Sequence, residues 1–252
     1  MMRTEMRLER TPFEELVDGL LTLALFHLAA PEGPVGTRLK AAKLTFIPSL
    51  AMFQDRVRAF NFSFYRYTWG PFSKQLYETW EDLQWAGLLI LEPGGSGKIF
   101  LTPEGHEIAQ DFIDEVLSMG ENQSVLEVLS DVAQRHGRAN TTTLLKRVYD
   151  IDVTPIGIPE RMRIGAAPMG VYFTIPVEER LARKTLQVPH QWLVKLDESL
   201  QRAKAMSAGR QEAIRPEILD DVAAAVAADD RGEGTRLTAD EMDKIKRQHG
   251  IA

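Results

Sequence analysis

The sequence contains no cysteine. This absence excludes disulfides, thiolate nucleophiles and cysteine-ligated zinc sites, and it suits a reducing compartment. The chain also lacks an apolar run that could cross a bilayer, because the longest run, Leu20 to Ala30, has about half the required length. The charged N-terminal residues do not have the pattern of a signal peptide. We therefore expect a cytoplasmic protein without a membrane partner.

A strong excess of charge of either sign is also lacking, although the charge is unevenly distributed. Residues 1–120 carry a net charge of −5, residues 121–216 one of +3 and residues 217–252 one of −4, which sum to −6. Nonspecific binding of nucleic acid usually needs a strong basic excess, and only the middle third leans that way. The acidic end is better suited to a basic partner protein.

Capping residues and apolar spacing predict the elements of the first 150 residues. The first helix has a capping hydroxyl at Thr11, a proline at its first position and a glutamate three residues after the cap, and it should end near Pro31. The other expected elements are a helix from about Thr37, a strand at Asn61–Trp69 that ends at Gly70-Pro71, a helix at Ser73–Ala86, a hairpin over Leu88–Leu101, a helix from Thr102 to about Met119, and helices at Ser124–His136 and Thr141–Tyr149. This order is typical of a winged-helix unit, here covering residues 11–150.

After residue 150 the pattern changes. Proline or glycine interrupts residues 151–170 every few positions, which predicts a linker or long loop. Residues 171–215 predict a small strand–helix region, and residues 216–252 predict a helical, partner-binding tail. The expected fold class is mainly α with a small β component: a winged-helix-like N-terminal domain plus a C-terminal α+β or helical extension.

Motifs that would carry catalysis or bind a metal are largely missing. None of the five histidines has a second histidine three or four residues away, and His106 beside Glu107 is more typical of a solvated histidine than of a ligand. Gly94–Lys98 resembles a phosphate loop but joins two expected strands, so it predicts a wing tip. Asp229–Asp240 resembles a calcium loop, but Arg231 occupies the third ligand position. We expect no catalytic residue, no metal, no cofactor and no enzymatic activity.

Aromatic residues are concentrated in the expected strand Asn61–Trp69. Alternation places Phe62 and Phe64 on one face and the tyrosines Tyr65 and Tyr67 on the other. The segment is either a core strand flanked by solvated arginines, which we favour, or a surface on which bases stack. Tyrosine and tryptophan are also frequent at protein interfaces, so Tyr65, Tyr67 and Trp69 are candidate partner-binding residues.

Four short motifs resemble a known family. They are Lys43-Leu44, the run Tyr65–Ser73, Leu83 with Gly87-Leu88-Leu89, and Leu101-Thr102-Pro103-Glu104-Gly105. In these motifs the segment of about residues 11–150 resembles the Panacea (SocA-like) antitoxin domain. In that family the aromatic residue before Gly-Pro is often tyrosine, whereas here it is Trp69. The resemblance implies a protein that binds and neutralises a cognate toxin or delivers it to a protease. A protease or chaperone is therefore a further expected partner.

The C-terminal residues are similar to the toxin-binding tails of small antitoxins. Two narrow apolar stripes supply candidate partner-binding residues, namely Leu219, Val222, Val226, Leu237, Met242 and Ile245. Such helices could dock into a groove on a partner, or they could pack on their own domain.

The alternative function is a transcription regulator that binds DNA through the helix at Ser73–Ala86 and the wing. This helix carries Lys74 but also Glu78, Glu81 and Asp82, and a helix that faces phosphates should not be so acidic. We therefore expect an antitoxin-type interaction protein and retain DNA binding as the alternative.

Overall fold

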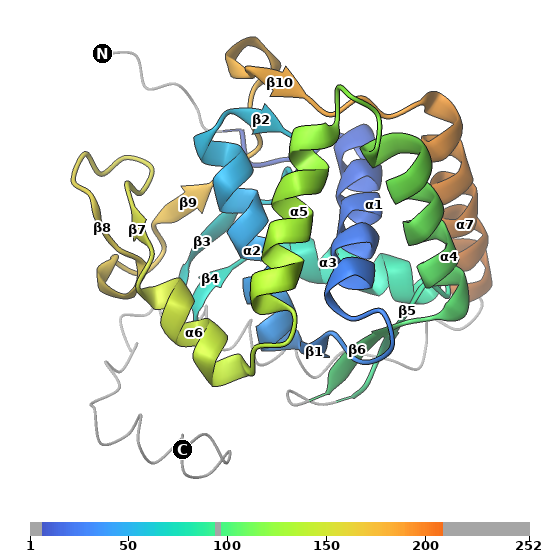
Figure 1. Cartoon of the computed structure of the whole chain (residues 1–252), viewed down its shortest axis with the longest axis horizontal. Helices are drawn as coiled ribbons and strands as arrows, with labels where there is room; N and C mark the ends of the chain where they lie inside the picture. Colours follow the sequence, from blue (N-terminus) through green and yellow to red (C-terminus); the bar gives the residue numbers. More distant parts are fainter. Residues whose placement is uncertain (1–6, 94–96, 209–252) are drawn as a thin grey trace. The chain divides into compact units, whose positions relative to one another are not determined.

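A computed structural model describes residues 7–93 and 97–208, with side chains as far as Gln201 (Figure 1). The chain divides into two units, residues 1–209 and residues 210–252, and only the first contains described residues. These residues are mainly helical with small sheets, so the predicted fold class, mainly α with a small β component, is confirmed.

The first four helices begin where the sequence predicts them. Thr11 and Glu14 form the expected capping box of α1 (Pro12–Ala29): the Thr11 hydroxyl accepts from the Glu14 amide at 3.3 Å, and the Glu14 carboxylate accepts from the Thr11 amide at 2.9 Å. The hydroxyls of Thr37, Ser73 and Thr102 cap the next three helices, each by accepting from the amide three residues on, without a reciprocal side-chain bond. These are α2 (Arg38–Gln54), α3 (Lys74–Trp85) and α4 (Pro103–Phe112). Each such cap stabilises its helix by about 1 kcal/mol.

One expected helix is shorter than predicted. After α4 the chain continues as a π-helical turn, η1 (Ile113–Leu117), in which the Ser118 amide donates to the Ile113 carbonyl five residues back. The following helices, α5 (Gln123–His136) and α6 (Thr141–Tyr149), lie where the sequence predicts them.

The expected hairpin is part of a three-stranded sheet. β5 (Leu89–Leu91) pairs with β6 (Lys98–Leu101), and β6 also pairs with a strand that the sequence did not predict, β1 (Gly36–Thr37) between α1 and α2. The strand order is β1-β6-β5, and the sheet lies at the bottom of the view in Figure 1.

A second sheet contains the aromatic segment. The predicted strand is reduced to β3 (Phe64–Tyr67), and the chain reverses at Thr68-Trp69 to return as β4 (Gly70–Phe72). The expectation that Gly70-Pro71 ends the strand is therefore wrong. Gly70 has φ +87°, which glycine adopts without strain and which allows the tight reversal. β9 (Tyr172–Thr174) completes the order β4-β3-β9.

Residues 151–170 do not separate two bodies. They form a short hairpin of β7 (Asp152–Val153) and β8 (Met162–Arg163) and a 3-10 turn, η2 (Ile164–Ala166). Val153 is 2% exposed and Ile164 is 0% exposed, so this segment packs on the first unit rather than linking it to another.

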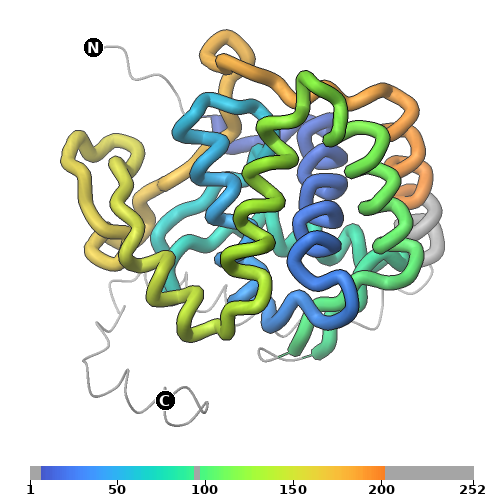
Figure 2. Tube along the Cα trace, viewed as in Figure 1, coloured from blue at the N-terminus to red at the C-terminus, as the bar shows by residue number. Residues whose placement is uncertain are grey.

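Residues 171–208 belong to the same unit. β10 (Lys184–Thr185) pairs in parallel with β2 (Val57–Arg58), η3 (Glu179–Leu181) precedes it, and α7 (His190–Ala208) packs against α3 and α1. Figure 2 shows α7 beside α4. The sequence predicts a separate strand–helix region over residues 171–215. In the structure its strands instead pair with β2 and β3, and its helix packs on α1 and α3. The predicted tail, residues 216–252, lies outside the described residues.

The core is centred on α1, which lies between α4, α5, α3 and α7. Every residue from Leu20 to Phe26 is 0% exposed. A helix that is apolar on all sides is stable only when other elements surround it, which explains the central position of α1. None of the described helices combines the length and the apolar character that crossing a membrane requires.

Candidate functional site

A cluster of aromatic rings occupies the outer face of the sheet β4-β3-β9. Tyr65 and Tyr67 lie on one face of β3 with ring centroids 6.3 Å apart. Across the sheet, Phe72 of β4 and Tyr172 of β9 each lie 5.6 Å from the Tyr65 ring. All four side chains are half-buried. We call these four residues, together with Tyr77, the aromatic face.

Tyr77 connects the aromatic face to the core. Its ring lies 5.1 Å from Phe72 and 4.8 Å from Trp80 of α3, and Trp80 lies 6.2 Å from Phe26 of α1. Burial raises the pKa of Tyr77 to about 12, and burial with the neighbouring tyrosines does the same for Tyr65. Both phenols are therefore neutral at physiological pH and can donate or accept hydrogen bonds.

The third predicted aromatic residue, Trp69, is half-buried in the turn between β3 and β4. Nearby, the Gly170 amide donates to the Arg66 carbonyl at 2.8 Å, which brings the preceding Met169 to this sheet. Met169 is an exposed apolar residue, with an exposed fraction of 52%.

The motif residue Lys43 is buried rather than presented to a partner. It is 2% exposed on α2, and its Nζ donates to the Pro71 carbonyl at 2.6 Å. Burial and the nearby Arg66 guanidinium lower the pKa of Lys43 to about 7. Two motifs that lie 28 residues apart are thus joined through one hydrogen bond, which fixes β4 on α2.

The other two motifs also meet. The Thr102 hydroxyl donates to the Gly87 carbonyl at 2.7 Å, and the Thr102 amide donates to the Leu88 carbonyl at 3.1 Å. A Cβ at Gly105 would lie 2.2 Å from the same Leu88 carbonyl oxygen, so only glycine fits there. These motif residues hold the helix–hairpin junction together.

Charged residues of α1 are engaged in buried ion pairs. Arg10 donates to Asp18 at 2.9 Å and to Thr79 at 3.1 Å, and the Asn61 amide donates to Asp18 at 2.8 Å. Burial raises the pKa of Asp18 to about 7, against the opposing effect of Arg10. This network joins α1, α3 and the segment before β3, so we assign it a structural role.

Glu14 is the second buried carboxylate of α1, and it is 1% exposed. Arg7 donates to it at 2.6 Å and Arg58 at 3.1 Å. Burial acts to raise its pKa, but the hydrogen bonds from Arg7, the Thr11 amide and Arg58 outweigh burial and lower the pKa to about 2.

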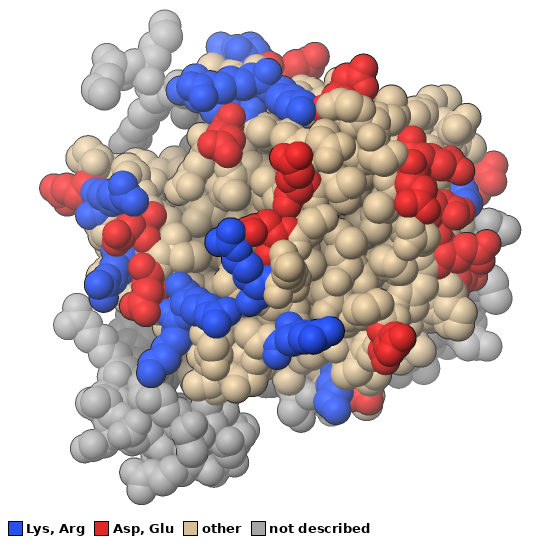
Figure 3. Space-filling view, in the orientation of Figure 1, with Lys and Arg blue, Asp and Glu red and all other residues tan. Residues whose placement is uncertain are grey.

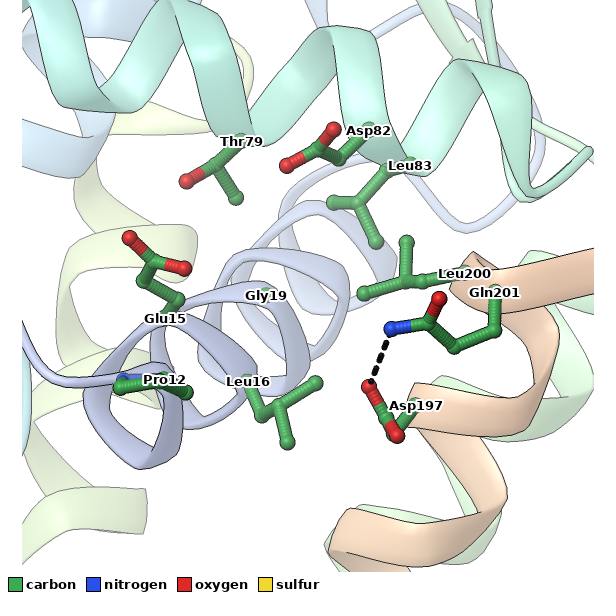
Figure 4. A pocket seen from close by; sticks show the side chains of 10 residues that line it. All are labelled: Pro12, Glu15, Leu16, Gly19, Thr79, Asp82, Leu83, Asp197, Leu200 and Gln201. Carbon is green, nitrogen blue, oxygen red and sulfur yellow. Dashed lines mark hydrogen bonds between the residues drawn. The ribbon is translucent and has the colours of Figure 1, made fainter. Parts of the chain in front are cut away.

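A cleft of about 220 Å³ opens between α1, α3 and α7 (Figure 4). Its lining residues are Pro12, Glu15, Leu16 and Gly19 of α1, Thr79, Asp82 and Leu83 of α3, and Asp197, Leu200 and Gln201 of α7. Sequence reasoning missed this cleft because no local pattern relates three helices that are far apart in the chain.

The histidine considered for a metal site, His106, faces another histidine. Its Nδ1 lies 3.0 Å from Nδ1 of His27, and Nε2 of His27 lies 3.0 Å from the side-chain oxygen Oε1 of Gln110. Burial and the neighbouring His27 lower the pKa of His106. Among the described residues, no three histidine, cysteine, aspartate or glutamate side chains are grouped as metal ligands would be.

The structure brings together part of the predicted partner-binding set. Tyr65 and Tyr67 are adjacent, and Trp69 follows them in the next turn. The tail residues Leu219, Val222, Val226, Leu237, Met242 and Ile245 lie outside the described residues. Sequence reasoning missed Tyr172, although it lies at the start of the expected strand–helix region of residues 171–215.

No protein-family model matches this sequence, and no curated protein matches it either.

Proposed function

We propose that the protein acts by binding another protein, and that this partner is a toxin which it neutralises. The observation that carries the proposal is the aromatic face on β4-β3-β9, with its ring-to-ring distances of 5.1–6.3 Å. Tyrosine is a frequent hot-spot residue at interfaces because it offers a large contact area and a hydrogen-bonding hydroxyl. Rings already held by their neighbours lose little side-chain entropy on binding.

The antitoxin assignment is supported by the motifs that resemble the Panacea domain. These motif residues act structurally here, because Lys43 binds the Pro71 carbonyl and Gly105 packs on Leu88. Tyr65 and Tyr67 belong to the motif Tyr65–Ser73 but stay half-buried on the aromatic face, so we expect them to be the motif residues that contact a toxin.

DNA binding is the second candidate. Apart from the strands β2-β3-β4 inserted between α2 and α3, the order α1-β1-α2, α3, β5-β6 favours it because winged-helix units use this succession. The charge of α3 weighs against it: Lys74 is paired with Glu78 at 3.1 Å, and Glu81 and Asp82 add further negative charge. α7 also packs against α3. On the face in Figure 3, basic side chains gather in separate places over β2–β10 and over α6, whereas acidic ones gather over α4.

The test is co-expression of the chain with each adjacent open reading frame, with growth and co-purification as readouts. We expect one neighbour to stop growth alone, and to be rescued and captured by this protein. Tyr65→Ala with Tyr67→Ala should reduce capture about tenfold or more, since truncation of a hot-spot aromatic residue costs over about 1 kcal/mol. Leu181→Ala is the matched control, because Leu181 is 51% exposed outside the aromatic face.

A separate variant tests the tail. A chain truncated after residue 215 should capture the toxin less well while its thermal midpoint stays unchanged. If truncation has no effect, the tail has no part in binding. If no neighbour is toxic, or if rescue occurs without a complex, the antitoxin proposal fails, and operator binding at stated salt concentrations then tests the DNA alternative.

A further inference from the structure

We propose that His27 of α1 and His106 of α4 form a proton-sensitive contact, which holds the two helices together at neutral pH and opens in mild acid. The two rings meet edge to face, with centroids 5.1 Å apart and planes at 68°, and their Nδ1 atoms lie 3.0 Å apart. At this distance one Nδ1 must donate a hydrogen and the other must accept it. The inference does not depend on the proposed partner protein.

The neighbouring residues determine which ring donates. The side-chain amide of Gln110 donates to Oδ2 of Asp114 at 2.8 Å, and its oxygen Oε1 lies 3.0 Å from Nε2 of His27. An amide oxygen can only accept, so Nε2 of His27 carries a hydrogen and Nδ1 of neutral His27 is the acceptor. Nδ1 of His106 is therefore the donor. Among the described residues, none is bonded to the other nitrogen of His106, Nε2, which is free to take up a proton.

Two added protons have different effects on this contact. The first can bind to Nε2 of His106 and leaves the bond between the Nδ1 atoms intact. The second has to bind to Nδ1 of His27, where it would point at the N–H of His106 across 3.0 Å. Two hydrogens, each about 1 Å from its nitrogen, would then be only about 1 Å apart, so the rings must separate. The pair therefore titrates as a coupled unit with two steps.

The pKa of His106 agrees with this direction. Burial and the neighbouring His27 lower it from the ordinary value of 6.5. The unfolded chain then binds the proton more tightly than the folded chain does. The stability that the contact contributes is therefore complete above pH 6.5 and is lost progressively as the pH falls below that value.

Charged groups on the neighbouring elements do not pair with the two rings. Among the described residues, no carboxylate, ammonium or guanidinium group is bonded to either ring. Pairs formed on elements packed against α1 and α4 are Lys74 with Glu78, Asp131 with Arg135, His136 with Arg147, and Asp111 with Lys195. The other carboxylates of α4 and η1 are exposed, so solvent screens them: Glu104, Glu107, Asp114 and Glu115. A proton added at the contact therefore meets no bonded counter-charge.

The contact joins the central helix to α4 and to the π-helical turn after it, and α1 and α4 lie side by side in Figure 1. His106, Gln110 and Asp114 recur at every fourth residue of α4 and η1, and hydrogen bonds connect all three to His27. The apolar residues of α4 that pack on the core, among them Phe112, do not titrate. We therefore expect acid to loosen α4 locally rather than to unfold the whole chain.

The first experiment records the histidine ¹⁵N and ¹³C shifts of the full chain by NMR between pH 8 and pH 4.5. We expect neutral His27 to carry its hydrogen on Nε2 and neutral His106 on Nδ1. We also expect His27 to titrate about one pH unit or more below His106. Opposite tautomers, or two independent titrations at the same pH, overturn the proposal. This measurement needs no variant, so it does not depend on whether a substituted chain folds.

The second experiment compares His27→Gln with His190→Gln by hydrogen exchange. The His27→Gln side chain can accept from Nδ1 of His106 but takes up no proton in this pH range. His190 is exposed on α7, so its replacement removes a titratable group outside the contact and is the matched control.

In the unsubstituted chain and in His190→Gln, the amides of α4 should exchange about tenfold faster at pH 5 than at pH 7, after correction for intrinsic exchange, since one pKa unit corresponds to a tenfold change. His27→Gln should abolish this acceleration and bring the pKa of His106 closer to 6.5. An acceleration that persists in His27→Gln, or that is missing from the unsubstituted chain, overturns the proposal.

Discussion

Replacing Gly105 with alanine is expected to destabilise the protein, although alanine is the better helix former. In a solvated helix the exchange would stabilise by about 1 kcal/mol. Here the new Cβ would lie 2.2 Å from the Leu88 carbonyl oxygen, which accepts the Thr102 amide at 3.1 Å. Relieving the clash must move backbone at the junction of β5 and α4. Overpacking of this kind costs about 1–3 kcal/mol and also weakens that hydrogen bond.

The net expectation for Gly105→Ala is a loss of about 1–2 kcal/mol, or a fall in the thermal midpoint of about 2–8 °C in calorimetry. Gly120→Ala is the matched control: a Cβ there would meet nothing within 4 Å, so its stability should be unchanged or slightly increased. A Gly105→Ala protein as stable as the unsubstituted chain would refute the reasoning, because the close approach of α4 to Leu88 would then not exist.

Three further predictions concern buried polar residues. At pH 7, Glu14 should stabilise the protein by about 3 kcal/mol relative to Glu14→Gln, because the pKa of Glu14 is lowered to about 2 in the folded state. This stability should be lost as the pH falls from 4.5 through 2. Urea titrations across this range measure the difference in the free energy of unfolding, and a difference that stays constant contradicts the prediction. The pKa of Lys43 is lowered to about 7 in the folded state, so the unfolded chain binds the proton more tightly. The free energy of unfolding should therefore rise by about 3 kcal/mol relative to Lys43→Met between pH 7 and 9.5. If the free energies of the two proteins change in parallel with pH, Lys43 titrates normally. The side chain of Asn122 is 0% exposed and forms hydrogen bonds with both the backbone amide and the carbonyl of Gln187, at 2.9 and 2.8 Å. Asn122→Leu should therefore lower the free energy of unfolding by about 2–4 kcal/mol in chemical denaturation and increase hydrogen exchange near β10. A loss below about 1 kcal/mol would mean that these bonds contribute little.

Local signals in the sequence identified most helices correctly. Thr11, Thr37, Ser73 and Thr102 cap the helices that they were expected to begin, because a capping side chain acts on amides two or three residues away. Alternation along β3 likewise separated buried Phe64 from Tyr65 and Tyr67, since successive side chains of a strand point to opposite faces. Both kinds of interaction act within a few residues, so the sequence alone determined these elements and the candidate residues that they carry.

Only the tertiary structure decided how distant segments combine. Tyr172 joins Tyr65 across the sheet, Lys43 meets the Pro71 carbonyl, and Ile164 is buried although its segment reads as a linker. The cleft between α1, α3 and α7 likewise requires α7 to lie beside Gly19 of α1. Proline and glycine in residues 151–170 mark where regular hydrogen bonding stops, but they carry no information about which surface the chain then covers. The surface that such a segment covers depends on apolar burial and strand pairing between residues about 30–180 positions apart. A short window of sequence does not contain both partners of such a contact.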